Sequence, residues 1–303
     1  MIRYKIYKYD KLYKQNLKLE RSLSEYKSII VDSPEEQISR ISLNRPKQRN
    51  SLSAELRKEL FEVLEKNDQD DDVSLTIIRG SGKDFCAGYD LKRSEDAEDP
   101  YYTAGGLGHW PRHVVEGCFK IWDLSKPVIA QVHGYCLAGG TELAQSCDLV
   151  YVADDAKIGY PVVRNISPPD NQFFPWIVGM RKAMELMLTG NSMSGVEAAE
   201  CGFATSSFPG RELETEVLKI AHNVAKIPHD VQQINKRSVH RQMELMGIRS
   251  ALRAGTELQQ LSMHTKSARN FFKMVAEEGL TKALSDRDSK HGDYRTDKSN
   301  KKD

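Results

Sequence analysis

The chain has 303 residues, of which 44 are basic and 43 acidic, so its formal net charge at neutral pH is +1. This balance gives no electrostatic reason to expect a nucleic acid or an anionic membrane as partner. A hydrophobic content of 39% can form one substantial core. The five cysteines are widely spaced without a Cys-x-x-Cys pair, which argues against a disulfide framework and a zinc site.

The sequence also predicts the cellular compartment and the character of the N-terminal segment. No apolar run approaches the roughly 20 residues that span a bilayer, and the N-terminus lacks the apolar region of a secretory signal. Together with the cysteine pattern, this predicts a cytoplasmic protein. Residues 1–23 use Lys and Tyr where transit peptides use Arg and Ser. We interpret them as a basic extension that lies on a neighbouring surface rather than as a transit peptide or a nucleic-acid arm.

Regular structure begins at residue 24. Residues 26–33 and 38–45 mix β-branched and polar side chains around a turn-forming segment, which predicts a β-hairpin. Ser53 can cap a helix over 56–67, and the apolar residues 73–80 then form a buried strand, which together predict a crossover unit. Two further strands, 126–134 and 148–153, flank a short helix at 140–147, so the fold class is α/β.

The pattern becomes helical after Pro209. Helices are predicted over 212–226, 231–246, 248–264 and a stretch around 271–286, with Pro228 and Gly247 as breaks. We therefore divide the chain into four regions and expect the last to be partly disordered because it is highly charged. These regions are the extension 1–23, an α/β core 24–209, a helical subdomain 210–288 and a charged tail 289–303.

Two glycine-containing turns each follow a predicted strand and lead toward a helix. The first is DFCAGYDLK, 84–92, and the second is HGYCLAGGTELAQSCD, 133–148. Glycine lets the main chain approach a ligand closely, and the start of a helix directs unpaired N–H donors outward. Two such donors directed at one oxygen would form an oxyanion hole.

These turns, in this order, resemble those of the crotonase (enoyl-CoA hydratase/isomerase) superfamily. NRPKQRNSL at 44–52 is similar to the family's opening segment, and LTGNSMSGVEAAECGFA at 188–204 is similar to its later signature. The resemblance covers about residues 24–288. It implies a spiral core of ββα repeats, C-terminal helices that assemble a homotrimer or a hexamer, and an enzyme of lipid and fatty acid metabolism. The implied substrate is an acyl-CoA thioester, with no cofactor besides the CoA that the substrate carries.

Carried over position by position, the resemblance implies particular site residues. The oxyanion donors would be the backbone N–H groups of Tyr89 and Gly139. Glu142 occupies the first of two glutamate positions in the family's hydratases, although a carboxylate there could also simply complement the helix dipole. The candidates for CoA binding are Ala87 and three cations that could equally be ordinary surface charges, namely Arg45, Lys47 and Lys92.

The chain departs from the family pattern at the second glutamate. That position is Val162, and valine cannot transfer a proton. Asp170 falls where the family's dienoyl-CoA isomerases place an aspartate, but it could also cap its own Pro-Pro-Asp-Asn turn. Arg164 and Asn165 replace apolar positions, which suggests a more polar pocket wall or a buried partner for a carboxylate.

Three aromatic or imidazole side chains near these turns are also notable. His133 precedes the second glycine turn, where a structural role is expected. His109 and Trp110 belong to a stretch that often lines the acyl pocket in this family, and Trp110 could close that pocket.

Several activities are compatible with these residues. The first hypothesis is hydration of a 2-enoyl-CoA through an enolate-like intermediate, with Glu142 as the main acid and base. The alternatives are an enoyl-CoA or dienoyl-CoA isomerase that uses Glu142 and Asp170, an acyl-CoA hydrolase, and a non-catalytic acyl-CoA binding protein. No metal is expected in any of them.

Overall fold

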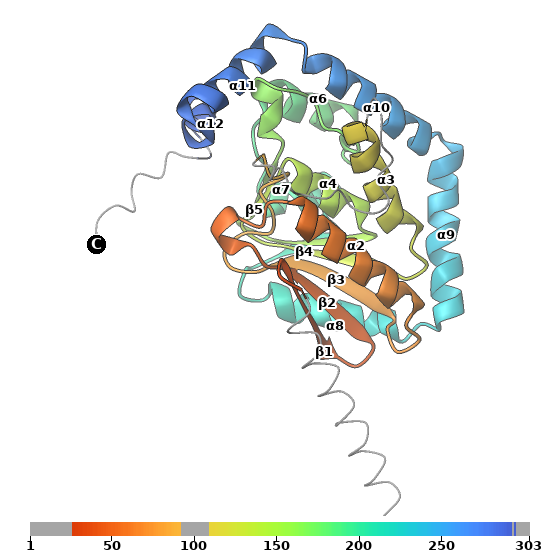
Figure 1. The fold of residues 1–303 in the computed structure, drawn as a ribbon. Helices are drawn as coiled ribbons and strands as arrows, with labels where there is room; N and C mark the ends of the chain where they lie inside the picture. The colour runs from red at the N-terminus through yellow and green to blue at the C-terminus, as the bar shows by residue number, and fades with distance from the viewer. Residues whose placement is uncertain (1–25, 92–108, 293, 295–303) are drawn as a thin grey trace, which may run out of the picture.

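In the computed structural model of the protein, residues 26–91, 109–292 and 294 are described (Figure 1). The predicted extension 1–23 lies outside them. The strands are β1 Ile29–Glu35, β2 Ile38–Leu43, β3 Leu75–Gly80, β4 Val128–Val132, β5 Tyr135–Leu137, β6 Leu149–Ala153, β7 Lys157–Gly159 and β8 Ser206–Phe208. The helices before the C-terminal region are α2 Ala54–Gln69, α3 His109–Asp123, α4 Gly139–Ser146, α5 Phe174–Ile177, α6 Gly179–Thr189 and α7 Gly195–Glu200, with short 3-10 helices η1 Pro46–Gln48 and η2 Pro161–Arg164.

The main sheet has the strand order β1-β2-β3-β4-β6-β8. The predicted hairpin is confirmed, because β1 pairs antiparallel with β2 and Ile29 lies opposite Leu43. All later pairs in this sheet are parallel, so each connection crosses over one face of the sheet. A second sheet is formed by β5 and β7 alone. The predicted α/β class is therefore confirmed.

Helix α2 shows how local sequence fixes one of these crossovers. The Ser53 side chain accepts a hydrogen bond from the Leu56 amide at 3.1 Å, as predicted for an N-cap. The buried face of the helix then packs on the sheet and joins the main core. Its apolar members are Leu56, Leu60, Phe61, Val63 and Leu64.

The C-terminal region contains α8 Leu213–Ala225, α9 His229–Leu245, α10 Ile248–Ser262, α11 Lys266–Glu278 and α12 Leu280–Ser289. Helix α8 packs on the main sheet and contributes Val217 and Ala221 to its core. Helices α9 to α12 form an arc around the rest of the molecule (Figure 1). The single helical stretch predicted over 271–286 is wrong, because Gly279 adopts φ +86° and separates α11 from α12.

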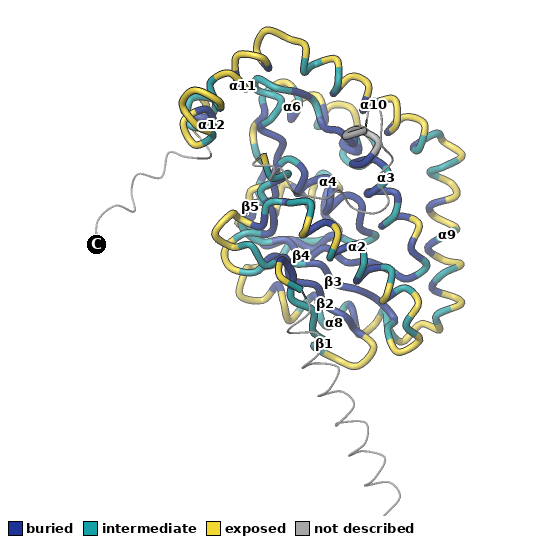
Figure 2. Tube along the Cα trace, viewed as in Figure 1, coloured by how far each residue is buried: buried dark blue, intermediate teal, exposed yellow. Residues whose placement is uncertain are grey.

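The buried residues lie in the centre of this arrangement, and the exposed residues lie on its outer side (Figure 2). Figure 2 shows buried backbone along the central strands and α4, and exposed backbone along the outer side of the arc. Within the tail region 289–303, α12 continues to Ser289, and Tyr294 is buried with its ring edge-on to Tyr135 at 6.2 Å. The other tail residues after 292 lie outside the described part of the chain. Among the helices that are described, none is long and apolar enough to cross a membrane.

Candidate active site

The two glycine turns predicted from the sequence lie side by side. The Cys86 amide donates to the Tyr135 carbonyl at 2.9 Å, and the Leu137 amide donates to the Cys86 carbonyl at 2.9 Å. These bonds hold the segment after β3 parallel to the segment after β4. The sheet therefore brings together two turns that are about fifty residues apart in the sequence.

Glycine is required in these turns because the chains approach so closely. A Cβ on Gly139 would lie 2.6 Å from two ring carbons of Tyr89. A Cβ on Gly88 would lie 2.8 Å from the Ala138 Cβ and 3.2 Å from the Gly139 nitrogen. Gly140 packs against the Cys86 carbonyl, where a Cβ would also collide. Side chains at these positions would push the two turns apart.

Both predicted amide donors lie at this junction. Gly139 is the first residue of α4, and the first amides of a helix have no acceptor within the helix. On the other turn, Asp90 donates to the Leu52 carbonyl at 3.2 Å. Because consecutive amides in an extended segment point to opposite sides, the Tyr89 amide points away from Leu52. The residue before Gly139, Ala138, adopts φ 51° and ψ −124°, a strained conformation for a residue with a side chain.

Glu142 lies in the first turn of α4 and is fully buried. The Asn171 amide donates to its Oε1 atom at 3.2 Å, and the Tyr160 hydroxyl lies 3.4 Å from the same oxygen. Its carboxyl group therefore points away from solvent, toward the segment that follows η2. One turn of helix separates it from the Gly139 amide, which places an ionisable group beside the candidate oxyanion site.

Burial raises the pKa of Glu142 from its ordinary value of 4.5 to about 7. Hydrogen bonds from the Asn171 amide, the Tyr89 hydroxyl, the Asp170 amide and the Tyr160 hydroxyl stabilise the charged form and oppose this rise. A carboxyl group with a pKa near 7 can both accept and donate a proton at neutral pH. This is the property that acid–base catalysis requires.

Asp170 lies next to Glu142, and it is only 4% exposed. Its backbone amide interacts with the Glu142 carboxylate, and its own negative charge raises the pKa of Cys118, Tyr89 and Tyr160 after the larger effect of burial. The negative charge of Glu142 raises the pKa of these same three groups. The two carboxyl groups therefore share one set of neighbours.

Three residues of the segment that departs from the family pattern have different surroundings. Val162 is half-buried and packs against the main core. The Arg164 guanidinium is buried and forms an ion pair with Asp288 of α12 at 3.1 Å. Of the two interpretations offered for Arg164, this geometry matches a buried partner for a carboxylate. Asn165 ends η2 and is half-buried.

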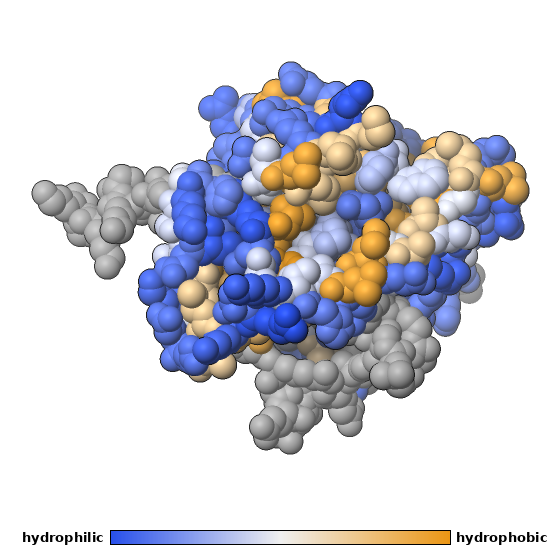
Figure 3. All heavy atoms as spheres, turned by 90° about the horizontal axis from the view of Figure 1, so that it is seen from above, coloured by the Kyte–Doolittle hydropathy of each residue, from blue (hydrophilic) through white to orange (hydrophobic). Residues whose placement is uncertain are grey.

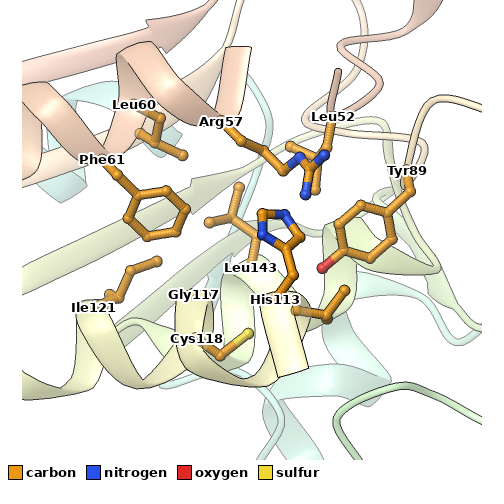
Figure 4. Close-up of a pocket in the computed structure, with 11 residues that line it drawn as sticks. Leu52, Arg57, Leu60, Phe61, Tyr89, His113, Gly117, Cys118, Ile121 and Leu143 are labelled. Carbon is orange, nitrogen blue, oxygen red and sulfur yellow. The ribbon is translucent and has the colours of Figure 1, made fainter. Parts of the chain in front are cut away.

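A small pocket beside Tyr89 has a cavity volume of about 30 Å³ and opens to solvent on one side. Figure 4 shows side chains from α2, α3 and α4 that point into it. Most of the lining is apolar, with Arg57, Tyr89 and His113 as polar members. The apolar lining is Leu52, Leu60, Phe61, Val114, Gly117, Cys118, Ile121 and Leu143.

Sequence reasoning missed the polar side chains of this pocket. Arg57 precedes Phe61 by one helical turn and is 7% exposed, so it lies on the buried face of α2. The sequence signal that could have identified Arg57 is a cationic residue within the otherwise apolar face of this helix. No local pattern marks His113 or the side chain of Tyr89, because their roles depend on packing between separate elements.

The candidates for CoA binding are in varied surroundings. The Arg45 guanidinium forms an ion pair with Asp90 at 2.8 Å, which ties η1 to the first glycine turn. Lys47 is exposed, and Ala87 is half-buried in that same turn. Lys92 lies outside the described residues. Binding of CoA by these residues stays a prediction.

Among the described residues that line the pocket, His133 is not present. His133 is half-buried, and its Nε2 atom lies 3.1 Å from the Gly82 carbonyl oxygen. His109 begins α3, but its side chain and that of Trp110 lie outside what is described. Over the described ranges, no group of three His, Cys, Asp or Glu side chains is placed to hold a metal ion.

Comparisons with known proteins agree with this geometry. A family model described as enoyl-CoA hydratase/isomerase matches residues 33–288. A protein of Mycobacterium tuberculosis (strain ATCC 25618 / H37Rv), EchA13, whose name refers to an enoyl-CoA hydratase, is 34% identical over 244 residues, covering 74% of this chain and 77% of that protein. The mitochondrial enoyl-CoA hydratase of Pongo abelii is 30% identical over 245 residues, covering 80% of this chain and 79% of that protein. The crystal structure of an enoyl-CoA hydratase/isomerase from Xanthobacter autotrophicus Py2 aligns with a TM-score of 0.79 at 30% identity, covering 88% of this chain and 98% of that chain.

Proposed function

The chain belongs to the enoyl-CoA hydratase/isomerase family, and we propose that it adds water across the double bond of a 2-enoyl-CoA thioester. The observation that carries this proposal is the position and ionisation of Glu142. Its buried carboxyl group has a pKa raised to about 7 and lies one helical turn from the Gly139 amide. A base at that point can activate water next to a thioester whose oxygen is held by main-chain donors.

The reaction would proceed in two linked proton transfers. Ionised Glu142 removes a proton from water, and the water oxygen attacks carbon three of the enoyl group. Negative charge then develops on the thioester oxygen, where the Tyr89 and Gly139 amides stabilise it as an enolate. A proton added at carbon two completes the hydration.

The donor of that second proton cannot be Val162. Asp170 is the candidate that this geometry favours. It is buried next to Glu142, and its negative charge raises the pKa of Cys118, as the charge of Glu142 also does. A relayed water is the alternative route.

A spectrophotometric assay tests the proposal. We expect the enoyl-CoA absorbance to fall when the purified protein is added, and Glu142→Gln to lose at least about 100-fold in kcat because it removes the base. Asp170→Asn separates the two proton routes, since a large loss assigns the second proton to Asp170 and a small loss assigns it to water. Glu185→Gln, on the exposed part of α6, is the matched control. Failure of the wild type to convert 2-enoyl-CoA across a panel of chain lengths would refute the proposal.

Isomerisation is the second candidate, and the shared surroundings of Glu142 and Asp170 favour it specifically. Two adjacent carboxyl groups could move a proton from one carbon to another without adding water. Mass spectrometry of the product distinguishes the reactions, because hydration adds the mass of one water molecule and isomerisation adds nothing. Release of free thiol would instead indicate thioester hydrolysis.

We also propose that the chain assembles as a homotrimer or hexamer. Apolar side chains on α6, α9 and α10 are strongly exposed, including Ile234 at 69% and Leu245 at 75%. Figure 3, seen from the side of α6, α10 and α11, shows apolar groups among the hydrophilic residues of that face. Such surface is normally covered in an assembly. Light scattering after size-exclusion chromatography would measure the mass, and a monomer would contradict this proposal.

A further inference from the structure

Two buried oxygen atoms at the candidate base have no hydrogen-bond donor within the described part of the chain. They are Oε2 of Glu142 and Oδ1 of Asn171, and both residues are fully buried. The Asn171 main-chain amide donates to the other carboxyl oxygen of Glu142, Oε1, at 3.2 Å, so the two residues are in contact. An ionised carboxylate and an amide oxygen only accept hydrogen bonds, so together they suit a ligand that donates two.

Helix α3 holds the side chain of Asn171 in place. Its Nδ2 atom donates to the Val114 carbonyl at 3.4 Å and lies 3.1 Å from the Cys118 sulfur. These contacts use the donor end of the amide, so the acceptor end, Oδ1, is the one that can bind a ligand. Burying an acceptor without a donor destabilises a fold unless a ligand supplies the hydrogen bond.

The pocket beside Tyr89 has the size of water rather than of an acyl chain. Its cavity volume is about 30 Å³, and it opens to solvent on one side. Because roughly 10 to 15 Å³ is enough for one water molecule, the pocket has room for about two. Val114 and Cys118, which contact the Asn171 side chain, also line this pocket, and Leu143 lines it next to Glu142 in the chain (Figure 4). The pocket therefore admits water, but not an acyl group, beside the residues that carry both acceptors.

We propose that Asn171 binds the water molecule that Glu142 activates, accepting one hydrogen bond at Oδ1 while Oε2 of Glu142 accepts the other. This inference rests on the proposed function, because it takes water as the nucleophile. One proton of the water moves to Oε2, and the water oxygen forms its bond to carbon three. The second O–H bond, held by Asn171, remains in the product as its hydroxyl group. Val162, at the family's second glutamate position, has no acceptor for this water, so Asn171 supplies it.

Two reactions at the same site separate this role from a purely structural one. Hydration of a 2-enoyl-CoA needs the bound water, whereas exchange of a carbon-two proton of butanoyl-CoA with deuterated solvent needs only the oxyanion amides and a base. Asn171→Leu is similar in shape and keeps the main-chain amide that donates to Glu142. We expect its kcat for hydration to fall about 100-fold, because the nucleophile is no longer oriented, and its exchange rate to change by less than about threefold.

A matched control is Asn223→Leu, which makes the same change on the exposed part of α8 and should leave both rates unchanged. Mass spectrometry of the acyl-CoA measures hydration and deuterium exchange in one experiment. Equal losses of hydration and exchange in Asn171→Leu, or no loss of hydration, would overturn the role of Asn171.

A high-resolution crystal structure of the wild type tests the water site without a variant and without turnover. An ordered water within about 3.2 Å of both Oε2 of Glu142 and Oδ1 of Asn171 would support it. Direct contact between the two oxygens, or a site without water, would overturn it whether or not the protein is active. Water at this site together with no conversion of any 2-enoyl-CoA would leave the site intact and refute only the hydratase activity.

Discussion

Replacing Glu142 with Gln should change the stability of the protein as well as its activity. In the folded state burial raises the pKa of this carboxyl group to about 7, whereas its ordinary value is 4.5. A group whose folded pKa is raised contributes its full stability below the unfolded pKa. That contribution is lost as the pH rises through the folded pKa. Wild type should therefore lose stability between about pH 4.5 and pH 7, and Glu142→Gln should not.

The magnitude follows from the same two pKa values. One group costs about 1.4 kcal/mol for each pH unit between its unfolded and folded pKa. Because Glu142 is fully buried, solvent does not screen this cost. We expect Glu142→Gln to gain about 2 to 3 kcal/mol relative to wild type on going from pH 5 to pH 8. The enzyme would then keep a destabilising carboxyl group because catalysis needs it.

Urea denaturation followed by circular dichroism at pH 5 and pH 8 measures this difference. Glu197→Gln is the control, because hydrogen bonds from the Ser194 amide and hydroxyl lower the pKa of Glu197 from its ordinary value of 4.5. The stabilisation from Glu197 is present above that unfolded pKa and is lost only as the pH falls below it, so the Gln variant should be less stable than wild type by a similar free energy at pH 5 and at pH 8. The reasoning about Glu142 would be refuted if wild type and Glu142→Gln differed by the same free energy at both pH values.

Three further substitutions test the geometry. Gly139→Ala places a Cβ 2.6 Å from the Tyr89 ring, which pushes the two oxyanion amides apart. We expect kcat to fall about 100-fold or more while the protein stays folded, with only a small change in its thermal midpoint of unfolding. Gly255→Ala, inside α10 with 3.5 Å to the nearest side-chain atom, should stabilise the protein by about 0.5 to 1 kcal/mol in urea denaturation without changing activity. Asp288→Asn leaves Arg164 without its buried counter-charge, and we expect a loss of about 3 to 5 kcal/mol together with faster proteolysis near Gly279.

Elements that depend on local sequence could be predicted. The hairpin of β1 and β2, the Ser53 cap of α2 and the two glycine turns each follow from side chains within a few residues of one another. The break at Gly279 was also a local signal, and sequence analysis placed a single helical stretch across it. The position of Glu142 within the site was available only through the resemblance of the second glycine turn to a family motif.

The chemical character of the site required the tertiary structure. Asp170 acquires its place beside Glu142 only when the segment after η2 folds against α4, and Arg164 finds Asp288 across 124 residues. A pKa near 7 for Glu142 results from its complete burial, which no single segment produces.

The sequence by itself determined the fold class, because strands, helices and turns depend on neighbouring residues, and it determined the family through the resemblance of its motifs. The main-chain donors at Tyr89 and Gly139 follow from that resemblance and stay a prediction. Only the tertiary structure decided which side chains face the pocket beside Tyr89. Arg57 and His113 come from helices that are separated by β3 in the chain, and packing alone brings their side chains to one cavity. Burial and long-range electrostatics are properties of the assembled core, so the raised pKa of Glu142 could not be predicted from local patterns.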